Sequence, residues 1–274
     1  ALAICVALGI ASLINPGVGL NIALPEDAVA FASGDLDFAG MGYTNAIVAL
    51  SNNINTELIW IHEILGSNEA LVVQEDSDIQ SISDLKGKRV ATPFSSTSHY
   101  SLLNALELAG LSAQDIQLLD MDTEDIVAAW ERKDIDAAYS WEPTLTVLKN
   151  SGCVLIDSQE LADMGYITAN IELVNKAFSE KYPELVADYI SALNQAVELY
   201  LNDTDQAVEA AATYLNVDQE TIRKQMAGSQ WVTAETQSTE NYLGTQDAPG
   251  NFHDIFLKTA EFLYGQQRIR QVPS

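Results

Sequence analysis

The chain has 274 residues and carries 13 Lys and Arg residues against 39 Asp and Glu residues, which gives a formal net charge of −26. So few basic residues cannot form the positive face that a phosphate backbone requires, and this excludes nucleic acid as a partner. Hydrophobic residues make up 47% of the chain. A chain of this length usually divides its core in two, so we expect an acidic, monomeric protein with two lobes.

The N-terminal segment 1–14 is apolar and uncharged. It fits either the apolar part of a signal peptide or a buried first strand of a parallel sheet, and both interpretations stay open. The run Leu2-Ala3-Ile4-Cys5 is similar to a lipidation box except at Ile4, so a membrane anchor is a further alternative. No later window of about 18 residues is apolar and uncharged, and no transmembrane helix is predicted.

Short apolar runs alternate with amphipathic stretches after this segment, which is typical of an α/β fold with a mostly parallel sheet. A helix is expected at Thr123–Glu131, where Ile126, Val127 and Trp130 fall on one face. The runs predicted as strands are Leu20–Leu24, Phe38–Met41, Ala70–Val73, Arg89–Thr92, Ile116–Leu119, Ala137–Tyr139 and Val154–Ile156.

The C-terminal part of the chain changes to a succession of amphipathic helices. Asp203 occupies the position of an N-cap between two of these helices. The predicted helices are Pro183–Asn202, Thr204–Leu215, Asp218–Gly228 and Phe252–Tyr264. The order is therefore α/β first and helical afterwards.

Four consecutive hydroxyl residues, Ser95 to Ser98, stand between the strand ending at Thr92 and the helix Ser101–Ala109. Free backbone N–H groups and hydroxyl donors at the positive end of a helix dipole bind anions without a basic side chain. Ser and Thr also cap helices routinely. The segment therefore predicts either a sulfonate, phosphate, nitrate or carboxylate site or a plain helix cap.

Two further strand ends carry residues suited to binding. Tyr43 and Thr44 lie in the turn Gly40–Asn45, which follows a strand ending at Phe38 and precedes an expected helix Ala46–Leu50, so they form either a second ligand-binding turn or a capped helix start. Trp141 ends the strand of Tyr139 and either packs over a ligand or belongs to the core.

The sequence does not predict an enzyme. Ser95 or Ser98 with His99 suggests a nucleophile and a base, but residues so close at a helix start point apart, and Gly-x-Ser-x-Gly is absent. No His pair at i, i+4 and no closely spaced Cys pair indicates a metal site, and Gly-rich phosphate loops are missing. We expect neither a cofactor nor a metal.

Four segments carry a resemblance to a known family: 32–38, 65–73, 87–103 and 128–141. At these segments the chain resembles the taurine-binding members of the aliphatic sulfonate, nitrate and taurine group of ABC-importer solute-binding proteins. The run from Pro93 to Tyr100, Pro-Phe-Ser-Ser-Thr-Ser-His-Tyr, is the most specific part. The resemblance implies a type II periplasmic-binding fold, with two α/β lobes joined by hinge strands and a helical C-terminal portion.

On this resemblance we expect residues 1–75 and 171–274 to form lobe 1 and residues 76–170 to form lobe 2. Ser96, Thr97 and His99 would hold a sulfonate from lobe 2, Tyr43 and Thr44 would meet it from lobe 1, and Trp141 would wall the cavity. The segment from Gly9 to Gly19 is shorter than the helix implied there, so contacts from that part are unassigned.

The resemblance also implies a carboxylate on the strand that returns to lobe 1, where it would hold the ligand's amine. This chain has Asn170 at that position. Either another carboxylate supplies the charge, with Glu142 the first choice and Glu69 the second, or the ligand is not an amine.

The resemblance predicts an extracytoplasmic solute-binding protein for taurine or a related short organosulfonate, handing its ligand to an ABC permease in the membrane. The expected location is periplasmic or extracellular. The alternatives are a binding protein for another small anion, such as an alkanesulfonate or nitrate, and an enzyme on the same fold that resembles the pyrimidine-precursor synthases.

Overall fold

The computed structural model describes residues 36–273, so segment 1–14, Cys5 and the predicted strand Leu20–Leu24 lie outside the described residues. The described chain divides into two compact units. Unit 1 comprises residues 36–64, 169–226 and 230–273, and unit 2 comprises Leu65–Thr168 and Ala227–Ser229. The chain leaves unit 1 after Ile64 and returns at Ala169, against expected crossings near residues 75 and 170.

Unit 1 is built on a sheet with the strand order β1-β8-β2-β9, in which β8 is antiparallel to both β1 and β2. A separate antiparallel ribbon joins β10 to β11. The strands are β1 (Phe38–Gly42), β2 (Thr56–Leu65), β8 (Ala169–Asn175), β9 (Ser229–Gln230), β10 (Gly244–Thr245) and β11 (Ala248–Pro249). The helices are α3 (Tyr43–Ser51), α8 (Lys176–Lys181), α9 (Pro183–Asn202), α10 (Thr204–Leu215), α11 (Gln219–Ala227), α12 (Ala234–Gln237) and α13 (Phe252–Gly265).

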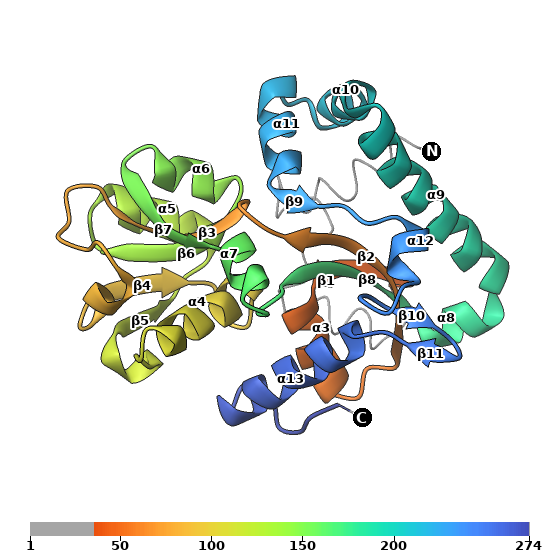
Figure 1. Cartoon of the computed structure of the whole chain (residues 1–274), viewed down its shortest axis with the longest axis horizontal. Helices are drawn as coiled ribbons and strands as arrows, with labels where there is room; N and C mark the ends of the chain where they lie inside the picture. Colours follow the sequence, from red (N-terminus) through yellow and green to blue (C-terminus); the bar gives the residue numbers. More distant parts are fainter. Residues whose placement is uncertain (1–35, 274) are drawn as a thin grey trace. The chain divides into compact units, whose positions relative to one another are not determined.

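Helices cover both faces of this sheet, with α3 and α13 on one side and α9, α10 and α11 on the other (Figure 1). The apolar stripe of α9 supplies Leu193, which packs in one buried cluster with Trp60 of β2, Val208 of α10 and Ile222 of α11. This burial fixes the long helices on the sheet. Of the helices in the described part of the chain, none combines the length and apolar character that a membrane crossing requires.

Unit 2 is built on a sheet with the strand order β5-β4-β6-β3-β7. Strand β4 is parallel to β5 and β6, whereas β3 is antiparallel to β6 and β7. The strands are β3 (Glu69–Gln74), β4 (Arg89–Thr92), β5 (Gln117–Asp120), β6 (Ala137–Trp141) and β7 (Gly152–Asp157). The helices are α4 (Thr97–Leu108), α5 (Thr123–Glu131), α6 (Thr144–Lys149) and α7 (Ser158–Asp163), with 3-10 turns at Ile82–Leu85 and Ala113–Asp115.

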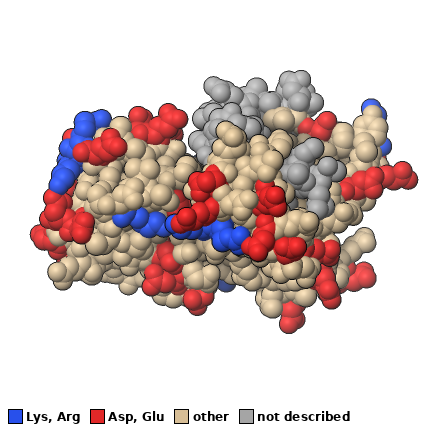
Figure 2. Space-filling view, turned by 90° about the horizontal axis from the view of Figure 1, so that it is seen from above, with Lys and Arg blue, Asp and Glu red and all other residues tan. Residues whose placement is uncertain are grey.

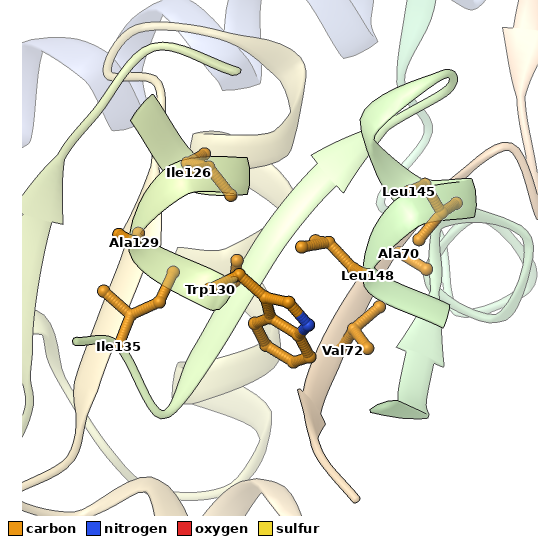
Figure 3. Packing of buried hydrophobic residues seen from close by; sticks show 10 residues of the cluster. Ala70, Val72, Ile126, Ala129, Trp130, Ile135, Leu145 and Leu148 are labelled. Carbon is orange, nitrogen blue, oxygen red and sulfur yellow. The ribbon is translucent and has the colours of Figure 1, made fainter. Parts of the chain in front are cut away.

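The core of unit 2 lies between β3 and the helices α5 and α6. Ala70 and Val72, two residues apart on β3, point to the same face and meet Trp130 of α5 and Leu148 of α6 (Figure 3). The Trp130 indole also donates a 3.0 Å hydrogen bond to Ser151 Oγ. Helix α4 covers the opposite face of the sheet (Figure 1), so its N-terminus is held by a sheet packed on both sides.

The structure confirms the α/β order followed by helices. Strand Arg89–Thr92 and the helices Thr123–Glu131, Pro183–Asn202 and Thr204–Leu215 have the predicted bounds. The expectation of a mostly parallel sheet is wrong, because β8 and β3 run against their neighbours. An apolar run shows that a strand is buried, but it does not show the direction of the strand.

Acidic side chains are scattered over the face seen in Figure 2 rather than gathered in one patch. Figure 2 shows Asp and Glu spread across the visible face, with Lys and Arg between them. This distribution fits a net charge that acts through general self-repulsion rather than through a single docking surface.

Candidate functional site

The turn between β4 and α4 has the geometry of a capped helix start. Ser95 has φ of 64°, in the left-handed region that few non-glycine residues adopt, and Ser96 is the extended N-cap. Ser96 Oγ accepts a 3.2 Å hydrogen bond from His99 N and donates to Pro93 O at 2.6 Å. The amides of Thr97 and Ser98 open the helix and have no acceptor within it. These N–H groups suit an anion.

His99 is fixed beneath this turn by two contacts. Its Nδ1 accepts a 3.1 Å hydrogen bond from Ser95 N, and its ring stacks on Phe94 with the centroids 4.6 Å apart. Phe94 N in turn donates to Asp120 Oδ1 of β5 at 2.9 Å. The histidine therefore holds the turn in shape, because it pins the residue with the unusual backbone conformation.

Glu69 lies at the start of β3 in a cluster of hydroxyl groups. It is fully buried and accepts hydrogen bonds from Ser98 at 2.7 Å, Ser158 at 2.9 Å and Thr168 at 3.3 Å. Burial raises the pKa of Glu69, and the hydrogen bonds from these hydroxyls and from Thr97 oppose that shift. Both carboxylate oxygens are thus engaged by groups of unit 2 itself.

Trp141 is the last residue of β6 in the same unit, and Glu142 follows it. Trp141 is partly exposed and pairs in register with Glu69. Glu142 Oε2 accepts from Thr146 N at 2.9 Å and from Thr146 Oγ1 at 2.6 Å, and its other oxygen lies 3.3 Å from Lys149 Nζ. The Glu142 carboxylate therefore has partners on α6.

Tyr43 and Thr44 open α3 in unit 1, where both side chains are buried. The Tyr43 hydroxyl lies 2.9 Å from Thr259 Oγ1 of α13, and its ring is near Phe252. Within residues 36–273, Thr44 Oγ1 has no hydrogen-bond partner. Tyr43 thus ties α3 to α13, whereas the Thr44 hydroxyl keeps its donor.

Asn170 is joined to a buried polar group on β2 and β8. Its Nδ2 donates a 2.6 Å hydrogen bond to Glu63 Oε1, and His62 Nε2 lies 2.6 Å from Glu172 Oε2. Asn170 and Glu172 are two residues apart on β8 and so share a face. The register of β2 shifts between Ile61 and Glu63, and this bulge lets His62 and Glu63, although consecutive, both reach that face.

The pKa values of His62 and Glu63 are both raised in this buried group. Burial raises the pKa of Glu63 to about 7, although the charge of His62 and the hydrogen bond from Asn170 oppose the shift. Burial disfavours the charged form of His62, but the hydrogen bond and charge of Glu172 and the charge of Glu63 outweigh it and raise its pKa. In the described structure, Glu63 Oε2 and Glu172 Oε1 lack hydrogen-bond partners although both are buried.

The structure therefore brings Glu69, Ser96, Thr97, His99, Trp141 and Glu142 into unit 2 and places Tyr43, Thr44 and Asn170 in unit 1. Sequence reasoning missed the pair His62 and Glu63. Two ionisable residues inside the apolar run from Leu58 to Leu65 were the available signal. Sequence reasoning also missed the hydroxyl groups of Thr92 and Ser140, which lie at or near the carboxyl ends of β4 and β6. Both hydroxyls are buried and have no hydrogen-bond partner among residues 36–273.

Comparison with known proteins gives matches over most of the chain. A family model described as NMT1/THI5 like matches residues 16–207. The taurine-binding periplasmic protein of Escherichia coli (strain K12) is 32% identical over 249 residues, which cover 89% of this chain and 75% of that protein.

Solved structures match as well. The periplasmic aliphatic sulphonate binding protein SsuA from Escherichia coli has a TM-score of 0.74 at 23% identity, with 91% of this chain and 81% of that chain covered. The desulfurization enzyme DSZB has a TM-score of 0.65 at 16% identity, with 99% of this chain and 91% of that chain covered.

These structural similarities define the fold: the chain has the α/β periplasmic-binding-protein fold, with two main sheets and a helical C-terminal part. Because the family model and the 32% identical relative both span most of the sequence, the chain belongs to the NMT1/THI5-like family. The same fold serves a binding protein and an enzyme, so the site must decide between these activities.

Proposed function

We propose that this chain is the extracytoplasmic solute-binding protein of an ABC importer and that its ligand is taurine or a closely related short organosulfonate. The observation that carries the proposal is the turn from β4 into α4, where a hydroxyl-capped helix presents the amides of Thr97 and Ser98. Residues 92–98 include no Lys or Arg. Such a site holds a permanently charged anion through N–H donors and the helix dipole.

The named relatives support the choice of a sulfonate among the possible anions. One is described as a taurine-binding periplasmic protein and another as a periplasmic aliphatic sulphonate binding protein. Their shared chemistry is a tetrahedral sulfonate on a short carbon chain. The proposed location is accordingly periplasmic or extracellular, and the proposed partner is a membrane permease.

Within this proposal, the sulfonate oxygens accept hydrogen bonds from the Thr97 and Ser98 amides, while Ser96 and His99 hold the turn that presents them. Trp141 provides an apolar wall for the carbon chain, since its ring is partly exposed at the end of β6. In unit 1, the Thr44 hydroxyl has no partner among residues 36–273 and is the candidate donor of that unit, next to Tyr43, which Thr259 holds.

A second candidate is an amine-free anion such as an alkanesulfonate or nitrate. The observation that favours it is Asn170, a neutral residue at the position where the family resemblance implies a carboxylate. A neutral amide offers an oxygen to an ammonium group but no full charge. Relative affinity for taurine and for its amine-free analogue separates the two candidates.

An enzyme is the less favoured alternative. The Ser98 hydroxyl donates to Glu69, and His99 Nδ1 accepts from a backbone amide, so Ser98 and His99 are not arranged as a nucleophile and its base. The expected outcome is that taurine incubated with the protein is recovered unchanged, as proton NMR of the mixture checks. The proposal involves no cofactor.

Ligand-induced stabilisation tests the proposed function. Taurine, propane-1-sulfonate, nitrate and sulfate are added separately to the full chain, and thermal unfolding is recorded. A ligand at a hundred times its Kd stabilises the folded state by about 2.7 kcal/mol, which is readily seen as a rise in Tm. We expect taurine to give the largest rise. If neither sulfonate raises Tm while nitrate or sulfate does, the ligand class is wrong.

A further inference from the structure

The buried polar group on β2 and β8 has two carboxylate oxygens that no described residue of unit 1 uses as an acceptor. Glu63 Oε2 and Glu172 Oε1 have no hydrogen-bond donor among residues 36–273. Glu63 is 0% exposed, so solvent does not satisfy its free oxygen.

A purely structural role does not explain this arrangement. A buried carboxylate without full pairing destabilises a protein, and an apolar residue of similar size is usually the more stable choice. The His62–Glu172 contact gives Glu172 a charged partner, whereas the Glu63 carboxylate receives only the neutral amide of Asn170. Glu63 is therefore the carboxylate of this group that has no charged hydrogen-bond partner.

A small hydrogen-bond donor with a positive charge would complete this group when Glu63 is ionised. In the described chain no group of three or more His, Cys, Asp and Glu side chains is placed to hold a metal ion, which favours an organic cation. An ammonium group on a two-carbon chain has the required charge and donors. Asn170 is partly exposed, so the Glu63–Asn170 pair reaches the surface of unit 1 at that residue.

We propose that Glu63, oriented by Asn170, accepts a hydrogen bond from the ammonium group of a zwitterionic aminosulfonate and thereby selects it over amine-free alkanesulfonates. This inference rests on the proposed function and names the residue that determines specificity. Asn170 fixes one carboxylate oxygen at 2.6 Å and leaves the other for the ligand. The charge expected at position 170 is thus supplied from the neighbouring strand.

The other two candidate carboxylates have partners already. Glu69 accepts from three hydroxyl groups of unit 2, and Glu142 is held by Thr146 and Lys149. Reading an ammonium group with either would require breaking those contacts. The free oxygen of Glu63 has no hydrogen-bond donor among residues 36–273 to give up.

Isothermal titration calorimetry with taurine and propane-1-sulfonate tests the inference. These ligands differ only in an ammonium group against a methyl group. Loss of a charge-assisted hydrogen bond corresponds to about a 10- to 150-fold loss of affinity. We expect Glu63→Gln to weaken taurine binding by that factor and to leave the Kd of propane-1-sulfonate within about twofold or improved.

Three further variants sharpen the test. Glu57→Gln makes the same chemical change at an exposed position of β2, where Glu57 pairs with Lys176, and should bind both ligands as the wild type does. Glu142→Gln should also keep its preference for taurine. The double variant Glu63→Gln with Asn170→Asp moves the charge across the 2.6 Å contact, and should recover most of the taurine affinity.

The outcomes separate the two proposals. If wild-type protein binds neither sulfonate, the proposed function fails and the inference fails with it. If it binds taurine, but Glu63→Gln weakens both ligands equally or neither, the inference alone is overturned. Selective loss of taurine in Glu142→Gln would also overturn it. If Glu63→Gln does not unfold cooperatively, two other measurements decide. A wild-type protein that prefers propane-1-sulfonate to taurine would refute the inference. A preference for taurine that is kept in the folded double variant Glu63→Gln with Asn170→Asp would support it.

Discussion

Asn170 Nδ2 and Glu63 Oε1 are joined by a 2.6 Å hydrogen bond between neighbouring strands of unit 1, while the second oxygen of Glu63 has no partner in the described chain. Only one of the two Glu63 carboxylate oxygens accepts a hydrogen bond, which is unfavourable for a buried carboxylate. Ionisable groups with strongly perturbed pKa values cluster at functional sites. Removing the charge should therefore affect stability and binding in opposite directions.

The first prediction is that Glu63→Gln stabilises the ligand-free protein at pH 8. Burial raises the pKa of Glu63 from 4.5 to about 7, so the folded state holds a proton that the unfolded state has lost. Wild-type stability accordingly falls as the pH rises from about 4.5 to about 7. We expect the variant to be more stable by about 2–3 kcal/mol at pH 8 and by less than about 1 kcal/mol at pH 5.

Urea unfolding at the two pH values measures this difference. Glu57→Gln, on the exposed part of the same strand, is the matched control and should change the free energy of unfolding by no more than about 0.5 kcal/mol. A Glu63→Gln variant that is less stable than wild type at pH 8 would show that the Glu63 carboxylate is paired in solution.

The second prediction concerns the pH dependence of taurine binding. The ionised form of Glu63 binds an ammonium group, and its pKa of about 7 means that binding below that pH must first release a proton. The groups that act on Glu63 are His62 of its own strand and the neutral Asn170 on β8. Glu172, also on β8, contacts His62. We expect taurine affinity to fall by about tenfold per pH unit below pH 7.

Calorimetric titration between pH 5.5 and pH 8.5 (about three pH units spanning this pKa) checks the slope. Propane-1-sulfonate has no ammonium group and should show a flat profile over the same range. His62 also titrates, because its pKa is raised above 6.5, so the Glu63→Gln variant is measured beside the wild type. A slope that persists in Glu63→Gln belongs to His62 rather than to Glu63.

Much of the fold follows from the sequence, because local patterns decide it. The helix Pro183–Asn202 has an apolar stripe and Pro at its first turn, and the strand Arg89–Thr92 is a short buried run; both have the predicted bounds. Strand direction was not predictable in the same way. The side chains of β3 are buried whichever way the strand runs, and only its neighbours in space define it as antiparallel.

The candidate site also has a part that local sequence predicts and a part that depends on contacts between distant strands. The turn at Ser96 is a local feature, and its hydroxyl residues predict either a cap or an anion site. The structure has Ser96 as the N-cap, and α4 begins at Thr97 rather than at the expected Ser101. The group around Glu63 depends on pairing between strands more than 100 residues apart and on a bulge that turns His62 and Glu63 to one face. Alternation along β8 indicated that Asn170 and Glu172 share a face, but not that this face is buried.

The third prediction is that Glu69 is a structural acceptor. Three hydroxyl groups, from Ser98, Ser158 and Thr168, donate to this buried carboxylate. Glu69→Leu leaves those donors unpaired and should destabilise the protein by about 3 kcal/mol or more. Glu131→Leu, on the exposed end of α5, should change stability by no more than about 0.5 kcal/mol. Equal unfolding midpoints for the two variants would contradict this role.

The last prediction separates helix capping from anion binding at Ser96. The Ser96 side chain accepts from His99 N at the start of α4, and Asn and Asp are caps of similar quality. Ser96→Asn and Ser96→Asp should therefore both keep the helix, whereas Ser96→Ala should lose about 1 kcal/mol of stability.

The two capping variants differ by a single negative charge. A sulfonate at the Thr97 and Ser98 amides would be repelled by that charge. We therefore expect Ser96→Asp to bind taurine and propane-1-sulfonate at least tenfold more weakly than Ser96→Asn does, a difference of about 1.4 kcal/mol in binding free energy. Asp203, the N-cap of α10 in unit 1, provides the control, since Asp203→Asn makes the reverse charge change at a helix with no proposed ligand and should leave both affinities unchanged. Equal taurine affinities for Ser96→Asp and Ser96→Asn would place the anion away from this turn, whatever the two variants do to stability.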